Sequence, residues 1–119
     1  MNEKVNKREV GGRYEQMACE YLEEEGLRVI ETNYRTRVGE IDIIARDKNE
    51  IVFIEVKYRK NRSYGGAEFA IPRSKQLTII RVAKVYIKMH GLSFRCFYRF
   101  DAVLIDGDEI RHIKNAWTL

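Results

Sequence analysis

The chain has 119 residues, of which 45% are hydrophobic and 34% are charged. This composition is typical of one globular domain and excludes an intrinsically disordered chain. No apolar run reaches the ~18 residues of a membrane-spanning helix, and the charged start, MNEKVNKREVGG, lacks the apolar stretch of a secretion signal. We therefore expect a cytoplasmic protein that does not contact membranes, with a disordered tail over residues 1–10 and a single domain over residues 11–119.

The first half of the chain predicts one helix followed by three strands. Residues 12–25 have helical spacing, and Gly26 suits the position just after a helix. The apolar stripe of this helix consists of Tyr14, Met17, Ala18, Tyr21 and Leu22. Residues 27–34 alternate as a strand does, and residues 39–59, GEIDIIARDKNEIVFIEVKYR, predict two further strands that form a hairpin.

The second half predicts a basic loop, a second helix and two strands. The loop covers residues 59–70, and Pro72 suits the first position of a helix that runs to Met89. Residues 93–106 predict a long strand, and residues 110–114 a short one after a Gly-Asp-Glu turn. The order helix, three strands, helix, two strands fits a largely antiparallel sheet with helices packed on it.

The cysteines and histidines give no sign of a metal site. Cys19 and Cys96 lie far apart in apolar patterns and are typical of buried thiols in a reducing compartment. His90 and His112 are not spaced as the histidine ligands of a metal site are. A Cys/His zinc site would need more cysteine or histidine ligands than this chain supplies.

Basic residues are concentrated in one part of the chain. Residues 57–99 contain eleven Lys and Arg against one acid, a net +10, whereas residues 1–26 contain seven acids and four bases. A basic field of this density suits a polyanion, most commonly nucleic acid. A solvated basic surface that binds nothing would show the same counts.

The predicted hairpin places four charged residues on one face. If residues 48–49 form the turn, the two residue numbers of every facing pair add up to 97. Asp42 then faces Glu55, and Glu40 faces Lys57, all on the same face. The other face is apolar throughout. It consists of Ile41, Ile43, Ala45, Val52, Ile54 and Val56.

Two facing carboxylates repel each other unless they share a proton or bind a cation. A divalent metal such as Mg²⁺ prefers carboxylate and water oxygens and would remove the repulsion between Asp42 and Glu55. Lys57 could orient water or an anion beside the metal, which is the set of groups that metal-assisted phosphodiester hydrolysis requires. The alternative is a simple Glu40–Lys57 salt bridge, with Asp42 at a frayed strand end.

An acid followed by Glu-x-Lys on adjacent strands resembles the core of the PD-(D/E)XK nucleases, the restriction-endonuclease-like superfamily. The segments YEQMACEYLEEEGLRVIETNYRTRVGEIDIIARD, IVFIEVKYR, SKQ and YRFDAV resemble the YraN family of small bacterial proteins. That family is similar in turn to archaeal Holliday junction resolvases. The resemblance covers residues 11–105 and implies an α/β (α+β mixed) fold with a central mixed sheet flanked by helices. The proline that names the superfamily is absent before Asp42.

The resemblance also implies a set of site residues. Asp42 and Glu55 would bind Mg²⁺ or Mn²⁺ together with the backbone carbonyl of Val56, and Lys57 would position or activate the attacking water. Glu15, on the first helix, would complete the site. The alternative for Glu15 is an ordinary solvated glutamate on a helix surface.

Nucleic-acid contacts are expected from the basic loop and from the start of the second helix. The SKQ motif would bring its lysine and glutamine to the charged end of the hairpin. The expected contact residues are Arg59, Lys60, Arg62, Arg73, Lys75 and Gln76. Three further basic residues, Arg81, Lys84 and Lys88, are more typical of a solvated helix face.

Together these features predict a divalent-metal-dependent endonuclease that hydrolyses phosphodiester bonds in branched or structured DNA. Symmetric cutting of a junction would require a homodimer. The alternative is a nucleic-acid-binding module with the same fold and no robust cleavage, and a weaker third hypothesis is an adaptor whose basic loop binds an acidic protein. Arg99 and Asp101 are expected to have structural roles only.

Overall fold

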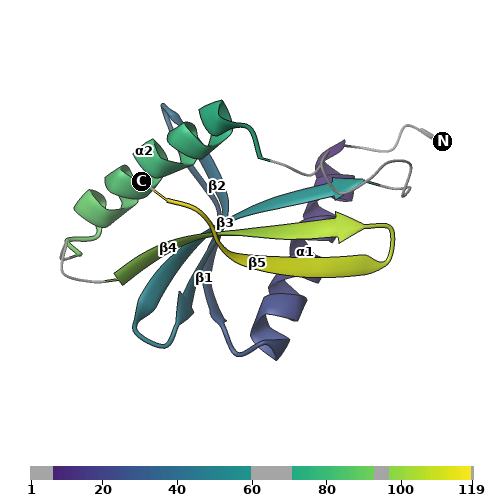
Figure 1. Ribbon diagram of the computed structural model, residues 1–119. Helices are drawn as coiled ribbons and strands as arrows, with labels where there is room; N and C mark the ends of the chain where they lie inside the picture. The colour runs from purple at the N-terminus through teal and green to yellow at the C-terminus, as the bar shows by residue number, and fades with distance from the viewer. Residues whose placement is uncertain (1–6, 60–70, 93–96, 119) are drawn as a thin grey trace.

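The computed structural model describes residues 7–59, 71–92 and 97–118, with side chains from residue 12 onwards. In these ranges the chain forms a five-stranded sheet and two helices (Figure 1). The elements are α1 (Lys7–Glu24), β1 (Arg28–Thr36), β2 (Gly39–Asp47), β3 (Glu50–Arg59), α2 (Arg73–Met89), β4 (Phe97–Asp106) and β5 (Glu109–Trp117). The order of elements predicted from the sequence is confirmed.

Some element boundaries differ from the prediction. α1 begins at Lys7 instead of residue 12, so residues 7–10 belong to a helix and not to a tail. The rest of the expected tail, the greater part of the basic loop and the first residues of the long strand lie outside the described residues. Pro72 is the residue before α2 and not its first residue, and β5 continues to Trp117.

The sheet is mixed, as the family resemblance implied. Its strand order is β1-β2-β3-β4-β5, and β3 and β4 are parallel while the other neighbours are antiparallel. Since parallel neighbours need a crossover connection, α2 lies between β3 and β4 in the chain. The predicted register of the hairpin is confirmed from Asp47 opposite Glu50 to Ile43 opposite Ile54.

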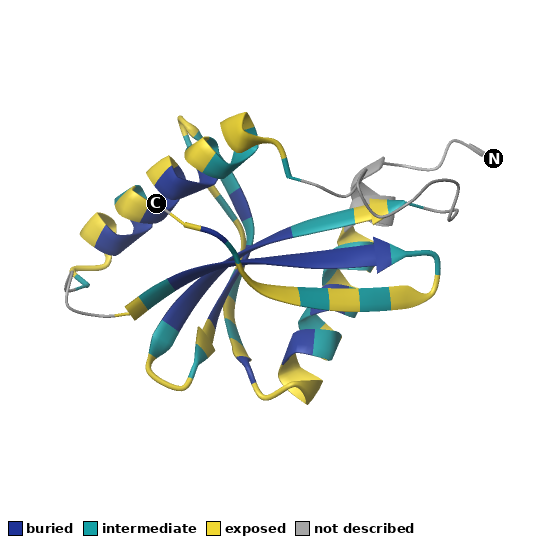
Figure 2. Ribbon diagram, in the orientation of Figure 1, coloured by how far each residue is buried: buried dark blue, intermediate teal, exposed yellow. Residues whose placement is uncertain are grey.

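The two helices cover opposite faces of the sheet and divide the core into two clusters (Figure 1). The central strands β2, β3 and β4 are buried along much of their length, whereas β1 and β5 are mostly exposed or half-buried, as Figure 2 shows. Under α2, the main members are Ile41, Ile44, Phe53, Ile79, Tyr86 and Phe100. Under α1, they are Ala18, Leu22, Ile43, Val52, Ile54 and Val103.

Ile41 was predicted on the wrong face of the hairpin. It packs under α2, whereas Ile43 packs under α1, although residues two apart share a face in a regular strand. The alternation is therefore broken at Asp42. The position opposite Asp42 on β1 is Asn33, whose φ of 53° is left-handed, so both strands are irregular at this point.

Candidate metal centre

Asp42 of β2 and Glu55 of β3 lie side by side where the two strands separate. Asp42 is half-buried and Glu55 is 9% exposed. The backbone N–H of Val56 donates to Asp42 Oδ2 at 2.9 Å. Burial, followed by the hydrogen bond and the charge of Glu55, raises the pKa of Asp42 to about 8. The two carboxyl groups thus retain a proton near neutral pH, as expected for closely facing acids.

Lysines lie on the same side of this pair. Lys57 follows Glu55 by two residues on β3, and Lys75 Nζ is 3.5 Å from Glu55 Oε2. A cavity of about 360 Å³ opens here. It is lined by Glu55, Val56, Lys57, Ile71, Pro72 and Lys75. Glu55 therefore lines a space in which an anionic ligand would meet Lys57 and Lys75.

Glu15 of α1 faces this acidic pair. It is half-buried, and its Oε2 accepts a hydrogen bond from Asn33 Nδ2 at 2.9 Å. Burial is the largest cause that raises the pKa of Glu15, and the negative charges of Asp42 and Glu40 raise it further, while the hydrogen bond from Asn33 lowers it. Glu15 is therefore within electrostatic reach of Asp42, and one of its carboxylate oxygens is bound by Asn33.

Glu40, at the start of β2, has a partner that the sequence did not suggest. Its Oε2 accepts a hydrogen bond from Arg35 Nε at 3.0 Å, across the β1–β2 pair. Asp42 lies inside β2 and not at a frayed end. Arg35 could have been found by extending the hairpin register to β1, where it faces Glu40.

The side chains of Asp42 and Glu55 would supply some, but not all, of the oxygen ligands that a divalent cation such as Mg²⁺ requires. Among the described residues no three His, Cys, Asp or Glu side chains are gathered closely enough to hold a metal ion. Two carboxylates and a backbone carbonyl nevertheless match the oxygen ligands of Mg²⁺ and Mn²⁺, which commonly keep several waters. The retained proton of the Asp42–Glu55 pair marks where a cation would relieve the repulsion. Asp42, Glu55 and the carbonyl of Val56 would hold it.

The predicted contact residue Arg59 is engaged within the protein. Its Nε and Nη2 bond to the two carboxylate oxygens of Asp106 at 3.2 and 3.1 Å, and both side chains are largely buried. This bidentate pair joins the ends of β3 and β4. Lys60 and Arg62, which were predicted as contacts too, lie outside the described residues.

The residues of the SKQ motif and their neighbour Arg73 divide into two groups. Gln76 Nε2 donates to the carbonyl of Ile71 at 2.9 Å, and Arg73 donates to Gln76 Oε1 at 3.0 Å and to the carbonyl of Thr118 at 3.4 Å. Arg73 and Gln76 thus brace the first turn of α2. Of these residues, only Lys75 has an ion pair with Glu55 among the described contacts.

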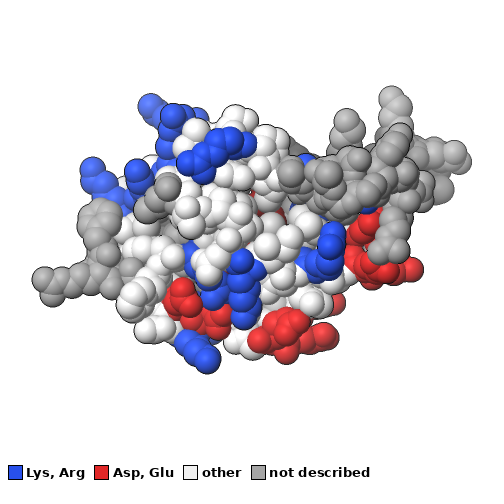
Figure 3. All heavy atoms as spheres, in the orientation of Figure 1, with Lys and Arg blue, Asp and Glu red and all other residues white. Residues whose placement is uncertain are grey.

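The outer face of α2 is basic. Arg81, Lys84 and Lys88 are all exposed, as predicted for this stripe. Figure 3 shows basic side chains gathered over α2 in the upper part of the view. These three residues belong to a separate surface from the cavity beside Glu55.

A buried polar network lies at the start of β3 and β4, at the end of these strands away from Glu55. It was not predicted from the sequence. Arg99 Nε and Nη2 donate to the two oxygens of the fully buried Asp101, each at 2.9 Å, and Arg99 Nη1 donates to Asp47 at 2.9 Å and to Glu50 at 3.2 Å. His112 Nε2 lies 2.6 Å from Asp101 Oδ2. The expected structural role of Arg99 and Asp101 agrees with this geometry.

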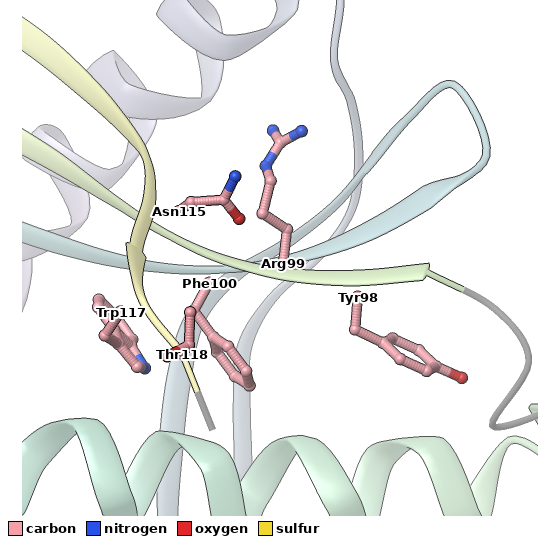
Figure 4. Close-up of a pocket in the computed structure, with 6 residues that line it drawn as sticks. All are labelled: Tyr98, Arg99, Phe100, Asn115, Trp117 and Thr118. Atoms are coloured by element: carbon pink, nitrogen blue, oxygen red, sulfur yellow. The ribbon is translucent and has the colours of Figure 1, made fainter.

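The network adjoins a pocket that is lined by Arg99 and Asn115 as well as by Tyr98, Phe100, Trp117 and Thr118. Figure 4 shows Arg99 and Asn115 pointing to the α1 side, while Phe100 and Trp117 point toward α2. Phe100 and Trp117 are stacked with ring centroids 5.7 Å apart, and the pocket around them has a volume of about 270 Å³. Neither feature reaches the carboxylate pair.

Of the two cysteines, only Cys19 is among the described residues. It is half-buried with a free thiol, and burial raises the pKa of this thiol. No helix of the described residues is both long and apolar enough to cross a membrane.

The fold and the site together define a small α/β protein with a five-stranded mixed sheet and a carboxylate pair beside lysines at one end of its central strands. The chain belongs to the uncharacterised protein family UPF0102, whose model matches residues 14–105. The family resemblance found in the sequence motifs is therefore confirmed.

Relatives match the chain over nearly its whole length. A UPF0102 protein of Vibrio campbellii is 41% identical over 114 residues, which is 93% of each chain. A UPF0102 protein of Lachnoclostridium phytofermentans is 44% identical over 113 residues, 95% of this chain and 96% of the relative. A solved structure of Archaeoglobus fulgidus Hjc, a Holliday junction resolvase, is similar with a TM-score of 0.48 and 18% identity, and covers 86% of this chain and 73% of that chain.

Proposed function

We propose that the protein is a divalent-metal-dependent endonuclease that hydrolyses phosphodiester bonds in branched or structured DNA. The observation that carries the proposal is the placement of Asp42 and Glu55: the N–H of Val56 donates to Asp42 at 2.9 Å, Lys75 lies 3.5 Å from Glu55, and Glu55 and Lys57 line the same cavity. Opposed carboxylates destabilise a strand pair, so their placement here indicates a ligand-binding role rather than a contribution to the fold.

Each group of the site has a definite task under this proposal. A bound Mg²⁺ or Mn²⁺ would polarise the phosphate and lower the pKa of water. Asp42 and Glu55 would hold the metal, and the N–H of Val56 fixes one oxygen of Asp42. Lys57 would orient the attacking water or stabilise the charge that develops on the phosphate. Lys75, next to Glu55, would contact a phosphate that enters the cavity.

DNA would be held by the basic surface around this cavity. Lys60 and Arg62, which follow β3 in the sequence and lie outside the described residues, are expected to contribute to phosphate binding. Because phosphate contacts carry no sequence information, such a surface suits recognition of DNA shape rather than of a base sequence. The resemblance of the motifs to the junction-resolvase branch makes branched DNA the first substrate to test.

A nucleic-acid-binding module without robust cleavage is the second candidate. The exposed basic stripe of α2, separate from the carboxylate pair, favours it. Such a surface would retain DNA even if the pair never bound a metal.

A cleavage panel tests the proposal. Duplex, flap and four-way junction DNA are incubated with the protein and Mg²⁺ or Mn²⁺, and Glu55→Gln serves as the matched inactive variant. Cleavage of a branched substrate by the wild type and not by Glu55→Gln is expected. DNA binding without cleavage of any substrate under either metal would favour the binding module instead.

A further inference from the structure

The end of β3 borders an opening in the sheet next to the candidate metal centre. The register between β2 and β3 ends at Ile43 and Ile54, whereas β3 pairs with β4 along its whole length. Glu55 and Lys57, in this last part of β3, line the cavity of the candidate site. Because side chains alternate along a strand, Tyr58 points to the opposite face, which α1 covers.

Tyr58 stacks on Tyr14 of α1. The two ring centroids are 4.0 Å apart, and the ring planes differ by 16°. Tyr14 is half-buried and packs against the core cluster under α1, whereas Tyr58 is 39% exposed. Tyr14 therefore supports one face of the Tyr58 ring from inside the protein, and the exposed surface of Tyr58 is open to a further partner.

The backbone that carries Tyr58 is fixed by bonds at the end of the strand. The next residue, Arg59, forms the bidentate pair with Asp106, and its carbonyl accepts a hydrogen bond from the N–H of Gly107 at 3.1 Å. These bonds join the end of β3 to the turn between β4 and β5. A ring that is already held in one orientation loses little conformational entropy when it binds a ligand. Tyr58 is thus preorganised for stacking.

The chemistry around this stack favours a nucleobase as the partner. Tyr14 precedes Glu15 and Tyr58 follows Lys57, so each ring is the sequence neighbour of a residue of the candidate site. Residues 57–62 contain four Lys and Arg and no acid. Proteins that bind single-stranded nucleic acid combine basic residues, which hold the backbone, with aromatic side chains on which the bases stack.

We propose that Tyr58 is a stacking platform for an unpaired base of the DNA that the candidate site binds. The proposal rests on the proposed function, because it names the feature of branched DNA that this site recognises. A base can stack on a protein side chain only after it has left the duplex. The preferred substrate is therefore DNA with an unpaired base beside the branch point, such as a flap, rather than a fully paired four-way junction.

The test compares two flap substrates, one with an intact unpaired base beside the branch point and one with an abasic nucleotide there. Their affinities for the full chain are measured in EDTA, so that no metal-dependent cleavage occurs. Tyr58→Leu removes the ring but keeps an apolar side chain, and Tyr58→Phe keeps the ring. Phe97→Leu is the matched control, because Phe97 is 63% exposed and lies opposite Glu50 at the other end of β3. Melting temperatures establish that the variants are folded.

The wild type should bind the intact flap about five- to a hundredfold more tightly than the abasic flap, the range typical of one stacked base. Tyr58→Leu should bind the intact flap as weakly as the wild type binds the abasic flap. Since the base and the ring act as a pair, Tyr58→Leu should bind the abasic flap no more weakly than the wild type does. Tyr58→Phe and Phe97→Leu should match the wild type on both substrates.

Photocrosslinking locates the base directly. When 5-iodouracil at the unpaired position is irradiated in the complex with the wild type, it should form a crosslink with Tyr58, which mass spectrometry of the peptides identifies. Because the crosslink and the comparison of the two flaps use the wild type, they decide the inference even if Tyr58→Leu does not fold.

Three results would each overturn the inference and leave the proposed endonuclease standing. They are equal affinity of the wild type for the two flaps, an equal loss in Tyr58→Leu against both flaps, and the absence of a crosslink to Tyr58. A wild type that binds no branched DNA would overturn both the proposed function and this inference.

Discussion

At the scale of single residues, Asp42 carries the clearest electrostatic consequence of the site. Burial and Glu55 raise its pKa from 3.8 to about 8 in the folded protein. Between these two values the folded state holds a proton that the unfolded state has lost. The free energy of unfolding of the metal-free protein should therefore fall as the pH rises from about 4 to about 8.

Asp42→Asn should remove most of this pH dependence, because asparagine neither ionises nor repels Glu55. It should also abolish specific Mg²⁺ or Mn²⁺ binding. The measurement is urea unfolding across this pH range, with Asp108→Asn, an exposed acid in the β4–β5 turn, as the control. Unchanged metal affinity in Asp42→Asn would show that the metal centre has been assigned to the wrong residues.

At the scale of elements, the contact between β2 and α2 sets the position of the site. Gly39 begins β2 with a φ of 154°, and a Cβ added there would lie 2.5 Å from Thr78 Cγ2 on α2. Gly39→Ala should therefore crowd Thr78 and strain the backbone at a positive φ, and should destabilise the protein by about 1–3 kcal/mol. Thermal unfolding measures the change.

Gly12→Ala is the matched control for this substitution. Gly12 lies in α1, and nothing lies within 4 Å of an added Cβ. Alanine is a better helix former than glycine by about 0.5–1 kcal/mol, so this variant should gain stability. The same Gly→Ala substitution is thus expected to lower the free energy of unfolding at residue 39 and to raise it at residue 12. A neutral Gly39→Ala would contradict the close β2–α2 packing.

The helices and strands could be predicted where the sequence pattern that indicates them lies within a short segment of the chain. Strand alternation and a short turn were sufficient to predict the register of β2 and β3 from Asp47 opposite Glu50 to Ile43 opposite Ile54, because both act within one hairpin. The start of α1 at Lys7 was missed because Gly11 and Gly12 are poor helix formers, although Val10 lies one turn before Tyr14 on the apolar stripe. The break in alternation at Asp42 depends on β1, and nothing in the sequence of β2 indicates it.

Contacts between distant segments could not be predicted in the same way. The bond from Asn33 to Glu15 joins residues 18 positions apart, and that from Arg99 to Asp47 joins residues 52 positions apart. Neither follows a helical or strand period. The bond from Arg59 to Asp106 joins residues 47 positions apart, and the basic run that led to the prediction of a DNA contact for Arg59 does not indicate it. Only the folded sheet brings these partners together.

At the scale of the whole molecule, the uneven charge predicts how the protein meets DNA. If phosphate contacts dominate, the logarithm of the affinity should fall linearly with the logarithm of the salt concentration. Replacing both Lys60 and Arg62 with alanine should reduce this slope by about two, one for each lost contact. Replacing Arg81 and Lys84, on the outer face of α2, should leave the slope nearly unchanged if DNA is held beside the cavity, whereas a reduced slope would favour the binding module. A flat salt response of the wild type would count against nucleic acid altogether.

The central claim is that this site hydrolyses DNA, and Lys57→Ala tests it most directly. The substitution leaves Asp42 and Glu55 in place but removes the cation expected beside the scissile phosphate. Single-turnover cleavage of branched DNA with Mn²⁺ should fall by about a hundredfold or more, the range seen when one stabilising donor is lost. DNA affinity should change little, because many other basic residues remain. Full cleavage activity in Lys57→Ala would contradict the account.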